Sequence, residues 1–306
     1  MPFLDTKRLR IHYQEGGAGS EAFVLVHGNF ASWRWWQPVL DRLRPRWRAF
    51  APDLRGCGET PTGEDPSAYG IAPLADDLAA FVDGLGLRTF HLVGHSLGGA
   101  VALRYALDHP DRARSLTLAA PPPPTGLSAM REGTSKSAQL LRSIDPDHGP
   151  SMAMLESSYR LHRSLGTNRL MLRQALAEMM PAASLEPAMT EALLADAARM
   201  SSDAVVGFLR ALHRWNVEAE LHRLRVPTTI LWGTRDVLVP RAGLEEMARL
   251  LGGELLVWPD TGHSPQLERP DQFVDLLASA GRRLLRKRFQ RWFARAMGWC
   301  TAAPKT

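Results

Sequence analysis

The chain has 306 residues, of which 45% are hydrophobic and 23% charged, a composition that excludes a disordered, collagen-like or coiled-coil protein and fits one large α/β domain or two small ones. Eight of the 37 Lys and Arg lie in residues 282–306, which hold no Asp or Glu, so the first 281 residues carry 29 basic and 32 acidic side chains. The net charge of +5 therefore resides in the C-terminal segment. The body lacks the basic surface that nucleic-acid binding needs, and no nucleic-acid partner is expected.

The sequence predicts neither a secretory signal nor a transmembrane helix. Residues 1–5 contain no apolar signal core, and the uncharged apolar-rich run at residues 89–103 is too short to span a membrane. The two cysteines, Cys57 and Cys300, lie far apart and form no metal-binding pattern. We therefore expect reduced thiols and a cytoplasmic location.

Short apolar strands alternate with helices in the first 120 residues. Strands are predicted at Leu9–Gln14, Ala22–Val26, Ala49–Ala51, Thr89–Val93 and Ala113–Ala120, and helices at Trp33–Leu43, Ile71–Leu85 and Gly98–Asp108. This alternation is typical of βαβ units, and it predicts an α/β fold with a mostly parallel central sheet flanked by helices.

The alternation stops at Pro121–Pro124 and resumes with strands at Val226–Trp232 and Glu254–Trp258, followed by a helix from Pro270. The intervening stretch shows helical patterns and no convincing strand. A structureless loop of about 90 residues is implausible in a compact domain, so we predict an inserted all-helical cap. The predicted domains are a core of residues 1–123 and 216–283, a helical cap of residues 124–215 and a basic amphipathic tail of residues 284–306.

The sharpest local pattern is Val93-Gly94-His95-Ser96-Leu97-Gly98-Gly99, where an apolar strand meets a helix. Glycines two residues before and two after Ser96 permit a turn too tight for a Cβ atom at either place. Such a turn raises the Ser96 hydroxyl above the sheet and places the Leu97 N–H at a helix start, where the backbone favours an anion. Ser96 is therefore the predicted nucleophile.

With this turn, the chain resembles the α/β-hydrolase superfamily over about residues 8 to 283, most of all its esterase-like branch with a helical cap. Three other segments carry the resemblance: Val26-His27-Gly28-Asn29, Asp53-Leu54-Arg55-Gly56-Cys57-Gly58 and Asp260-Thr261-Gly262-His263. The resemblance implies an α/β-hydrolase fold with an inserted helical cap. It implies a mechanism far more specifically than a substrate, because the superfamily supports many chemistries.

A serine nucleophile needs an adjacent base and a carboxylate that orients the base. The resemblance places the base at His263 and the acid at Asp236, in the chain order Ser96, Asp236, His263 that is usual for this fold. Asp260, three residues before His263, is an alternative acid, although it more easily caps its own turn. His95 cannot easily fold back onto Ser96, and His27 is expected to be structural.

A tetrahedral intermediate needs two donors aimed at its oxyanion. The Leu97 N–H is one, and the resemblance implies the backbone N–H of Asn29 as the other, with Gly28 permitting close approach. An asparagine at this place also binds halide in dehalogenases. Dehalogenases and epoxide hydrolases use an aspartate nucleophile, however, so Ser96 disfavours both chemistries.

Substrate-binding residues are predicted less sharply. Phe30 and Trp33 follow the oxyanion turn and are expected to contact the substrate. Methionines are concentrated in the predicted cap, where they either line an adaptable apolar pocket or only pack helix on helix. They are Met130, Met152, Met154, Met171, Met179, Met180, Met189 and Met200.

The prediction is a serine hydrolase that cleaves a carboxylic ester, thioester or lactone of a small hydrophobic acyl substrate. No phosphate-binding loop and no zinc spacing is present in the sequence, so no cofactor and no metal are expected. Two other interpretations stay open. The same triad could cleave a carbon–carbon bond or transfer an acyl group, and the fold could serve as a non-catalytic accessory protein.

The C-terminal tail combines a helical apolar face with many cations. The apolar residues are Leu285, Phe289, Trp292, Phe293 and Ala296, and the cations are Arg282, Arg283, Arg286, Lys287, Arg288, Arg291 and Arg295. Either the last core helix continues and packs these aromatic residues, or residues 284–306 form a basic helix on an anionic membrane surface. The second interpretation predicts a peripheral protein at the inner face of the membrane, and an acyl carrier protein would satisfy the same charges.

Overall fold

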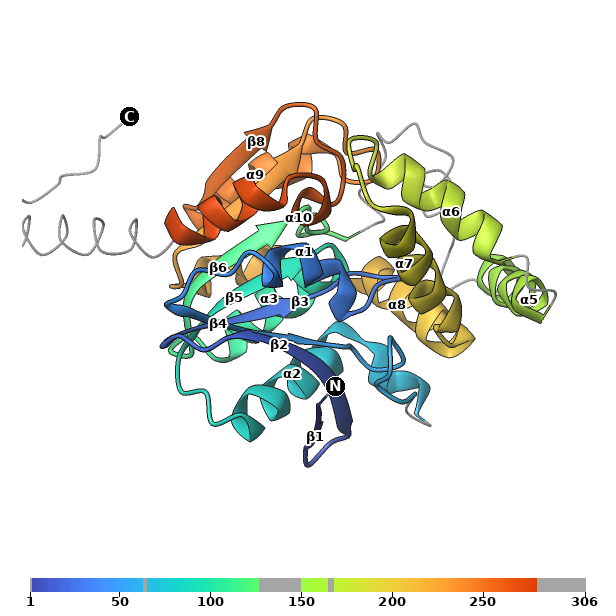
Figure 1. Cartoon of the computed structure of the whole chain (residues 1–306), viewed down its shortest axis with the longest axis horizontal. Coiled ribbons are helices and arrows are strands. Elements are labelled where there is room, and N and C mark those ends of the chain that lie inside the picture. Colours follow the sequence, from blue (N-terminus) through green and yellow to red (C-terminus); the bar gives the residue numbers. More distant parts are fainter. Residues whose placement is uncertain (1, 63–64, 127–149, 165–167, 280–306) are drawn as a thin grey trace, which may run out of the picture.

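A mixed eight-stranded sheet forms the centre of the computed structural model, which describes residues 2–62, 65–126, 150–164 and 168–279 (Figure 1). Its strand order is β1-β2-β4-β3-β5-β6-β7-β8. The strands are β1 Phe3–Asp5, β2 Arg10–Gly17, β3 Glu21–Val26, β4 Trp47–Pro52, β5 Phe90–His95, β6 Ala113–Ala119, β7 Thr228–Gly233 and β8 Glu254–Trp258. β1 pairs antiparallel with β2, and β2 with β4, whereas β3 to β8 run parallel. The predicted fold is confirmed, and β1 is the strand that the sequence patterns missed.

The sheet separates two apolar cores, because side chains alternate between its faces along each strand. In β3, Val24 and Val26 lie in one core with helices α2 Ile71–Gly84, α3 Leu97–Asp108 and α9 Arg241–Leu251. Phe23 and Leu25 lie in the other, which includes Trp47 and the helical residues 270–279. Both faces are thus covered, as a parallel sheet requires.

The single helix predicted at Trp33–Leu43 is wrong in detail. The segment forms a 3₁₀ turn, η1 Trp33–Trp36, followed by the short helix α1 Gln37–Leu40. Pro38 stands in the first turn of α1, where its missing N–H costs nothing, but it cannot continue a helix begun before it. The remaining short elements are η2 Pro66–Tyr69, η4 Glu218–Arg223 and α10 Pro265–Glu268.

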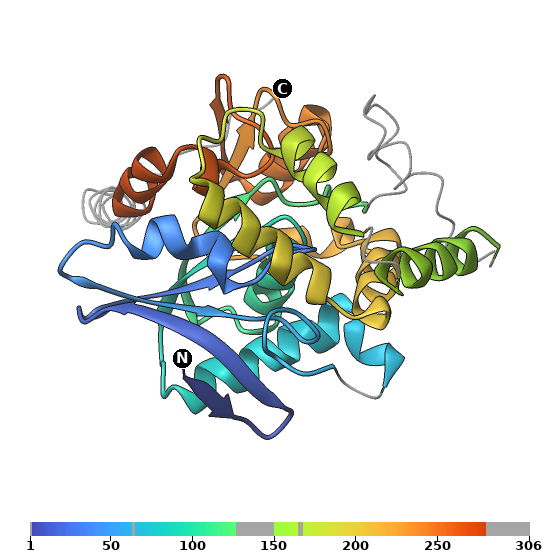
Figure 2. The same cartoon turned by 45° about the vertical axis from the view of Figure 1, so that its right-hand side comes forward.

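Among the described residues, four α-helices lie between β6 and β7 in the chain and gather beside one end of the sheet (Figures 1 and 2). These inserted helices are α5 Pro150–Ser164, α6 Asn168–Met179, α7 Pro187–Arg199 and α8 Ser202–Arg214. Apolar residues of α8, among them Phe208 and Leu212, pack into the core shared with α2 and α3. α6 and α7 form a separate apolar cluster that includes Trp35.

The predicted domain boundaries and the capping role of residues 124–215 stay predictions. The structure does not describe residues 127–149 of the predicted cap or the predicted tail, 284–306, which includes Cys300. The other cysteine, Cys57, is a buried free thiol. In the described ranges, no helix is both long and apolar enough to cross a membrane.

A buried histidine in the sheet predicts a pH dependence of stability. His91 on β5 is 5% exposed and hydrogen-bonds Ser115 Oγ at 2.7 Å, and burial lowers its pKa to about 4. Between about pH 6.5 and pH 4 the unfolded chain therefore binds a proton at this residue that the folded chain does not. The free energy of unfolding should fall by up to about 3 kcal/mol across that window as the pH falls.

Urea unfolding of the wild-type protein and of a His91→Gln variant at pH 7 and pH 4.5 checks this expectation. Burial also lowers the pKa of His27 and His95, and both proteins share that contribution. The variant should lose less stability on acidification than the wild type. An equal loss in both proteins would contradict the prediction.

Candidate active site

Four of the predicted site residues follow strands of the parallel part of the sheet. Asn29 comes after β3, Ser96 directly after β5, Asp236 after β7 and His263 after β8. Parallel strands end at the same edge, where the loops of an open α/β sheet form a crevice. The strand order therefore brings residues 167 positions apart in the chain, Ser96 and His263, to one edge of the sheet.

Ser96 stands in a strained turn between β5 and α3. Its φ of 52° and ψ of −122° are a backbone conformation that non-glycine residues rarely adopt. A Cβ atom at Gly94 would lie 2.3 Å from the Gly98 carbonyl oxygen, and one at Gly98 would lie 2.3 Å from the His27 carbonyl oxygen. The two glycines are thus required by backbone contacts, as the sequence pattern predicts. Unlike its buried neighbours, Ser96 is partly exposed.

His263 and Asp236 form a buried pair. His263 Nδ1 lies 2.9 Å from Asp236 Oδ2, and the two side chains are 3% and 0% exposed. Because a carboxylate oxygen only accepts, Nδ1 carries the proton and the lone pair is on Nε2. The second oxygen of Asp236 accepts from the N–H groups of Leu238 and Val239 at 2.8 and 3.0 Å. These donors hold the carboxylate in the orientation that His263 requires.

The alternative acid, Asp260, is engaged elsewhere. Its side chain is 67% exposed and accepts a hydrogen bond from Arg235 Nη2 at 2.7 Å. Asp260 also has a φ of 48° in the turn that leads to His263. Asp260 therefore helps to shape the turn before His263. The carboxylate that hydrogen-bonds His263 is that of Asp236.

Two buried neutral histidines brace the site. His95 Nε2 donates to the carbonyl oxygen of His263 at 2.9 Å, which joins the Ser96 turn to the His263 loop. Burial, with His263 nearby, holds the pKa of His95 well below its usual value. His27 Nε2 accepts from the Leu54 N–H at 2.9 Å and Nδ1 lies 2.8 Å from the Gly28 oxygen, and burial lowers its pKa too. Both contacts support the structural role expected for His27.

The two predicted oxyanion donors belong to backbone segments that adjoin Ser96. Leu97 is the first residue of α3, where its N–H has no acceptor within the helix. A Cβ atom at Gly28 would come within 3.0 Å of the Ser96 Cβ, so the backbone that precedes Asn29 passes directly beside the serine. The Asn29 side chain accepts from the Phe30 N–H at 2.9 Å, and Phe30 has a φ of 54°.

The predicted substrate contacts separate in the structure. Phe30 is partly exposed and its ring lies 6.2 Å from that of Tyr159 on α5. Trp33 is only 7% exposed and packs in the core beneath the sheet with Trp36 and Trp47, a position that does not favour substrate contact.

Trp35 is a residue that the sequence patterns did not single out. Its ring stacks on His95 at 5.5 Å and belongs to the apolar cluster of α6 and α7. Its indole N–H is buried and has no partner among the described residues. The sequence pattern predicts an α-helix with Trp33 and Trp36 on its apolar face, and Trp35 is not on that face. The segment is instead a 3₁₀ turn, in which Trp35 is buried as well.

The methionines of the inserted helices divide between core and surface. Met180 and Met200 are buried, whereas Met154 and Met171 are exposed. Met130 lies outside the described residues. Across the described ranges no group of three His, Cys, Asp or Glu side chains is placed to hold a metal ion.

Comparisons with known proteins agree with this architecture. A family profile described as the alpha/beta hydrolase fold matches residues 21–270. The dihydrolipoyllysine-residue acetyltransferase component of the acetoin cleaving system from Cupriavidus necator is 30% identical over 281 residues, covering 90% of this chain and 67% of that protein. The 2-hydroxy-6-oxo-6-phenylhexa-2,4-dienoate hydrolase from Burkholderia cepacia is 27% identical, covering 88% and 92%. A solved esterase from Exiguobacterium antarcticum is similar in fold, with a TM-score of 0.73 at 22% identity over 90% of this chain and 97% of that one.

Proposed function

The chain belongs to the α/β-hydrolase fold family, and we propose that it is a serine hydrolase that cleaves a carboxylic ester, thioester or lactone of a hydrophobic substrate. The observation that carries this proposal is the buried His263–Asp236 pair at the sheet edge where Ser96 stands in its strained turn. The pair leaves the Nε2 lone pair of His263 free to act as a base, and the turn presents a serine hydroxyl at the same edge.

In the proposed reaction, Ser96 Oγ attacks the carbonyl carbon while its proton passes to His263 Nε2. The negative oxygen that develops is held by the Leu97 and Asn29 N–H groups. The carbon–oxygen or carbon–sulfur bond then breaks as His263 gives the proton to the leaving group. Water attacks the acyl-serine as His263 takes one of its protons. The bond between the acyl carbon and Ser96 Oγ then breaks, His263 returns the proton to Oγ, and the carboxylic acid leaves. Asp236 orients the ring and stabilises its cation in both halves.

The apolar surroundings of the site support a hydrophobic acyl group. Phe30 follows the oxyanion residue directly and faces Tyr159 of the inserted helices. Behind the site, the buried ring of Trp35 packs with apolar residues of α6 and α7, which keeps this side of the site apolar. Removing an acyl chain from water contributes about 0.8 kcal/mol per CH₂ group, a gain of up to roughly fourfold in kcat/KM for each methylene that the site buries.

A fluorophosphonate probe and a series of p-nitrophenyl esters test the proposal. The probe should add one equivalent to Ser96, located by peptide mass spectrometry, and kcat/KM should rise from the acetate to the octanoate. Folded wild-type protein that neither reacts with the probe nor hydrolyses any ester would contradict the proposal and favour a non-catalytic accessory role. A flat chain-length series would contradict the hydrophobic pocket alone.

A second candidate uses the same triad on another bond or acceptor. The relative named as a hydrolase of an oxo-dienoate favours carbon–carbon cleavage, and the one named as an acetyltransferase component favours acyl transfer. Probe labelling of Ser96 without ester hydrolysis would support this candidate. Product analysis with a vinylogous diketone, and with an acyl thioester plus an alcohol acceptor, would then distinguish the two reactions.

A further inference from the structure

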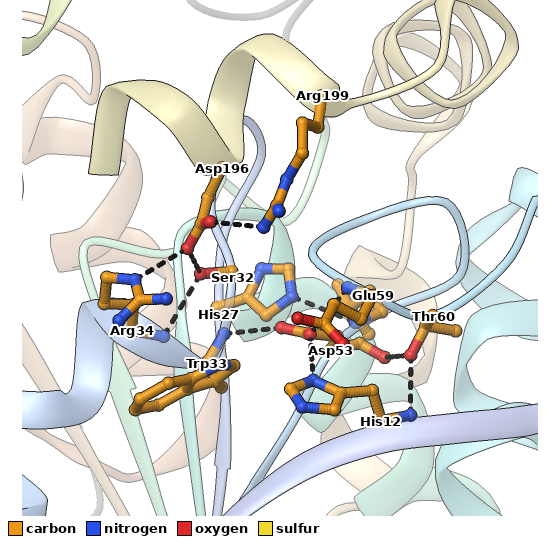
Figure 3. A network of polar contacts seen from close by, with 11 residues as sticks. His12, His27, Ser32, Trp33, Arg34, Asp53, Glu59, Thr60, Asp196 and Arg199 are labelled. Atoms are coloured by element: carbon orange, nitrogen blue, oxygen red, sulfur yellow. Dashed lines mark hydrogen bonds and ion pairs between the residues drawn. The ribbon is translucent and has the colours of Figure 1, made fainter. Parts of the chain in front are cut away.

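A carboxylate from the inserted helices reaches the loop that carries Asn29 (Figure 3). Asp196 of α7 is 4% exposed. Its Oδ2 accepts from Ser32 Oγ at 2.6 Å and from Arg34 Nε at 2.9 Å. Its Oδ1 accepts from Arg199 Nη2 at 2.6 Å, which is the contact within its own helix. Two of the three bonds thus cross from α7 to the segment after β3.

Ser32 is the residue of this loop that donates a hydrogen bond to Asp196. Its side chain is completely buried, and its oxygen accepts from the Arg34 N–H at 3.2 Å as the N-cap of η1. A hydroxyl has one proton to donate, and here it goes to Asp196. The carboxylate therefore fixes the rotamer with which Ser32 starts η1.

The oxyanion loop is residues 27–33, which run from the end of β3 to the first residue of η1. Its first residue, His27, is held through Leu54, and its last, Trp33, donates its N–H to Asp53 Oδ1 at 2.7 Å. Asp53 is in turn bound by His12 Nδ1 at 2.6 Å (Figure 3). These contacts come from the core and fix the two ends.

The middle of the oxyanion loop is held by the inserted helices. Ala31 packs in the cluster of Leu193, Leu194 and Ala197 on α7, and Ser32 beside it binds Asp196. Phe30, one residue earlier, has the strained φ of 54°, a conformation that persists only where the surroundings enforce it. The position of the Asn29 peptide thus depends on α7 as well as on the core.

We propose that Asp196 is a positioning residue that ties α7 to the oxyanion loop, so that the Asn29 N–H is aimed correctly only while α7 is docked. The proposal rests on the serine-hydrolase function proposed above. The contact makes the inserted helices part of the apparatus that positions the oxyanion donor. Asp196 touches neither the substrate nor the reacting atoms.

Loss of this contact should appear in kcat more than in KM. An oxyanion donor acts mostly in the transition state, and a misplacement of about 1 Å costs on the order of 10²-fold in rate. For Asp196→Ala we expect kcat for a p-nitrophenyl ester to fall about 10- to 100-fold, as for a weakened oxyanion donor, with KM changed less than about threefold. The pH profile of kcat should keep its shape, because the His263–Asp236 pair is untouched.

Glu191→Ala is the matched control. Glu191 lies on the same helix and pairs with Arg169 and Arg173 of α6, so its removal breaks an ion pair of α7 without reaching the oxyanion loop. Its kcat should stay within about twofold of wild type, because the ion pairs of Glu191 are exposed to solvent and contribute little free energy. Ser32→Ala removes the same hydrogen bond from the loop side. In a double-mutant cycle, Ser32→Ala combined with Asp196→Ala should be little worse than either single variant.

The outcomes separate this inference from the proposed function. Wild-type protein that fails both probe labelling and ester hydrolysis overturns the function and the inference with it. If the wild type is active, three results would overturn the inference alone. They are a wild-type kcat in Asp196→Ala, a loss of kcat in Glu191→Ala equal to that in Asp196→Ala, and additive losses in the double-mutant cycle. If Asp196→Ala does not fold, the test is Ser32→Ala, in which Asp196 still forms its hydrogen bonds with Arg34 and Arg199. A wild-type kcat in Ser32→Ala then overturns the inference.

Discussion

Replacing Ser96 with alanine should lower kcat for hydrolysis of a p-nitrophenyl ester by on the order of 10⁶-fold, the loss measured when the serine of such a triad is removed from subtilisin. The proposed reaction requires the oxygen of Ser96 to form the acyl intermediate, and alanine has no atom that can replace it. The measurement is kcat from initial rates at saturating ester, with intact-mass analysis after the fluorophosphonate probe. The variant should show no added mass.

The fold should survive this change, since Ser96 Oγ caps no helix and alanine is smaller. The thermal midpoint should therefore stay close to that of wild type. Ser67→Ala serves as the matched control, because Ser67 is an exposed serine of η2 whose side chain donates to Asp65 within its own turn. An active Ser96→Ala protein, or probe labelling that persists on another residue, would refute the assignment of the nucleophile.

Replacing Asp236 with asparagine should lower kcat by about 10⁴-fold, as the same change does in the triad of a serine protease. The reason lies in the neighbours of the carboxylate. Leu238 and Val239 aim two N–H donors at Oδ1, so the amide oxygen of the variant takes that place and its NH₂ faces His263 Nδ1. The ring must then accept at Nδ1 and carry its proton on Nε2, the tautomer that cannot deprotonate Ser96.

Asp260→Asn is the control that separates the two candidate acids. Asp260 is exposed and binds Arg235, so its change should alter kcat less than about threefold and stability by less than about 1 kcal/mol, as expected for a surface ion pair. Steady-state kinetics of both variants over pH 6 to 9 provide the measurement. A larger loss in Asp260→Asn than in Asp236→Asn would reverse the assignment.

Local patterns in the sequence were sufficient for the fold and for the strained turn that carries Ser96, the proposed nucleophile. Alternating apolar strands and amphipathic helices determine an α/β topology because each element buries one face at a fixed period. The Gly94–Gly98 spacing around Ser96 is visible as a short pattern in the sequence. The constraint on Gly94 is local, because a Cβ atom there would meet the Gly98 carbonyl oxygen, whereas a Cβ atom at Gly98 would meet the His27 carbonyl oxygen of another strand end. β1 was missed because its three residues, Phe3–Asp5, are too few to show a period.

Contacts between distant segments were decided only by the tertiary structure. The sequence favoured Asp236 as the acid and left Asp260 as an alternative. In the structure, Asp236 hydrogen-bonds His263 Nδ1 through the loops that follow the paired strands β7 and β8. Trp33 was expected to contact the substrate because it follows the oxyanion turn. The structure buries it with Trp36 and Trp47, and its contact with substrate stays a prediction. Asp196 gave no signal in the sequence: it lies 164 positions from Ser32, and a hydrogen bond at that separation depends on how whole helices pack.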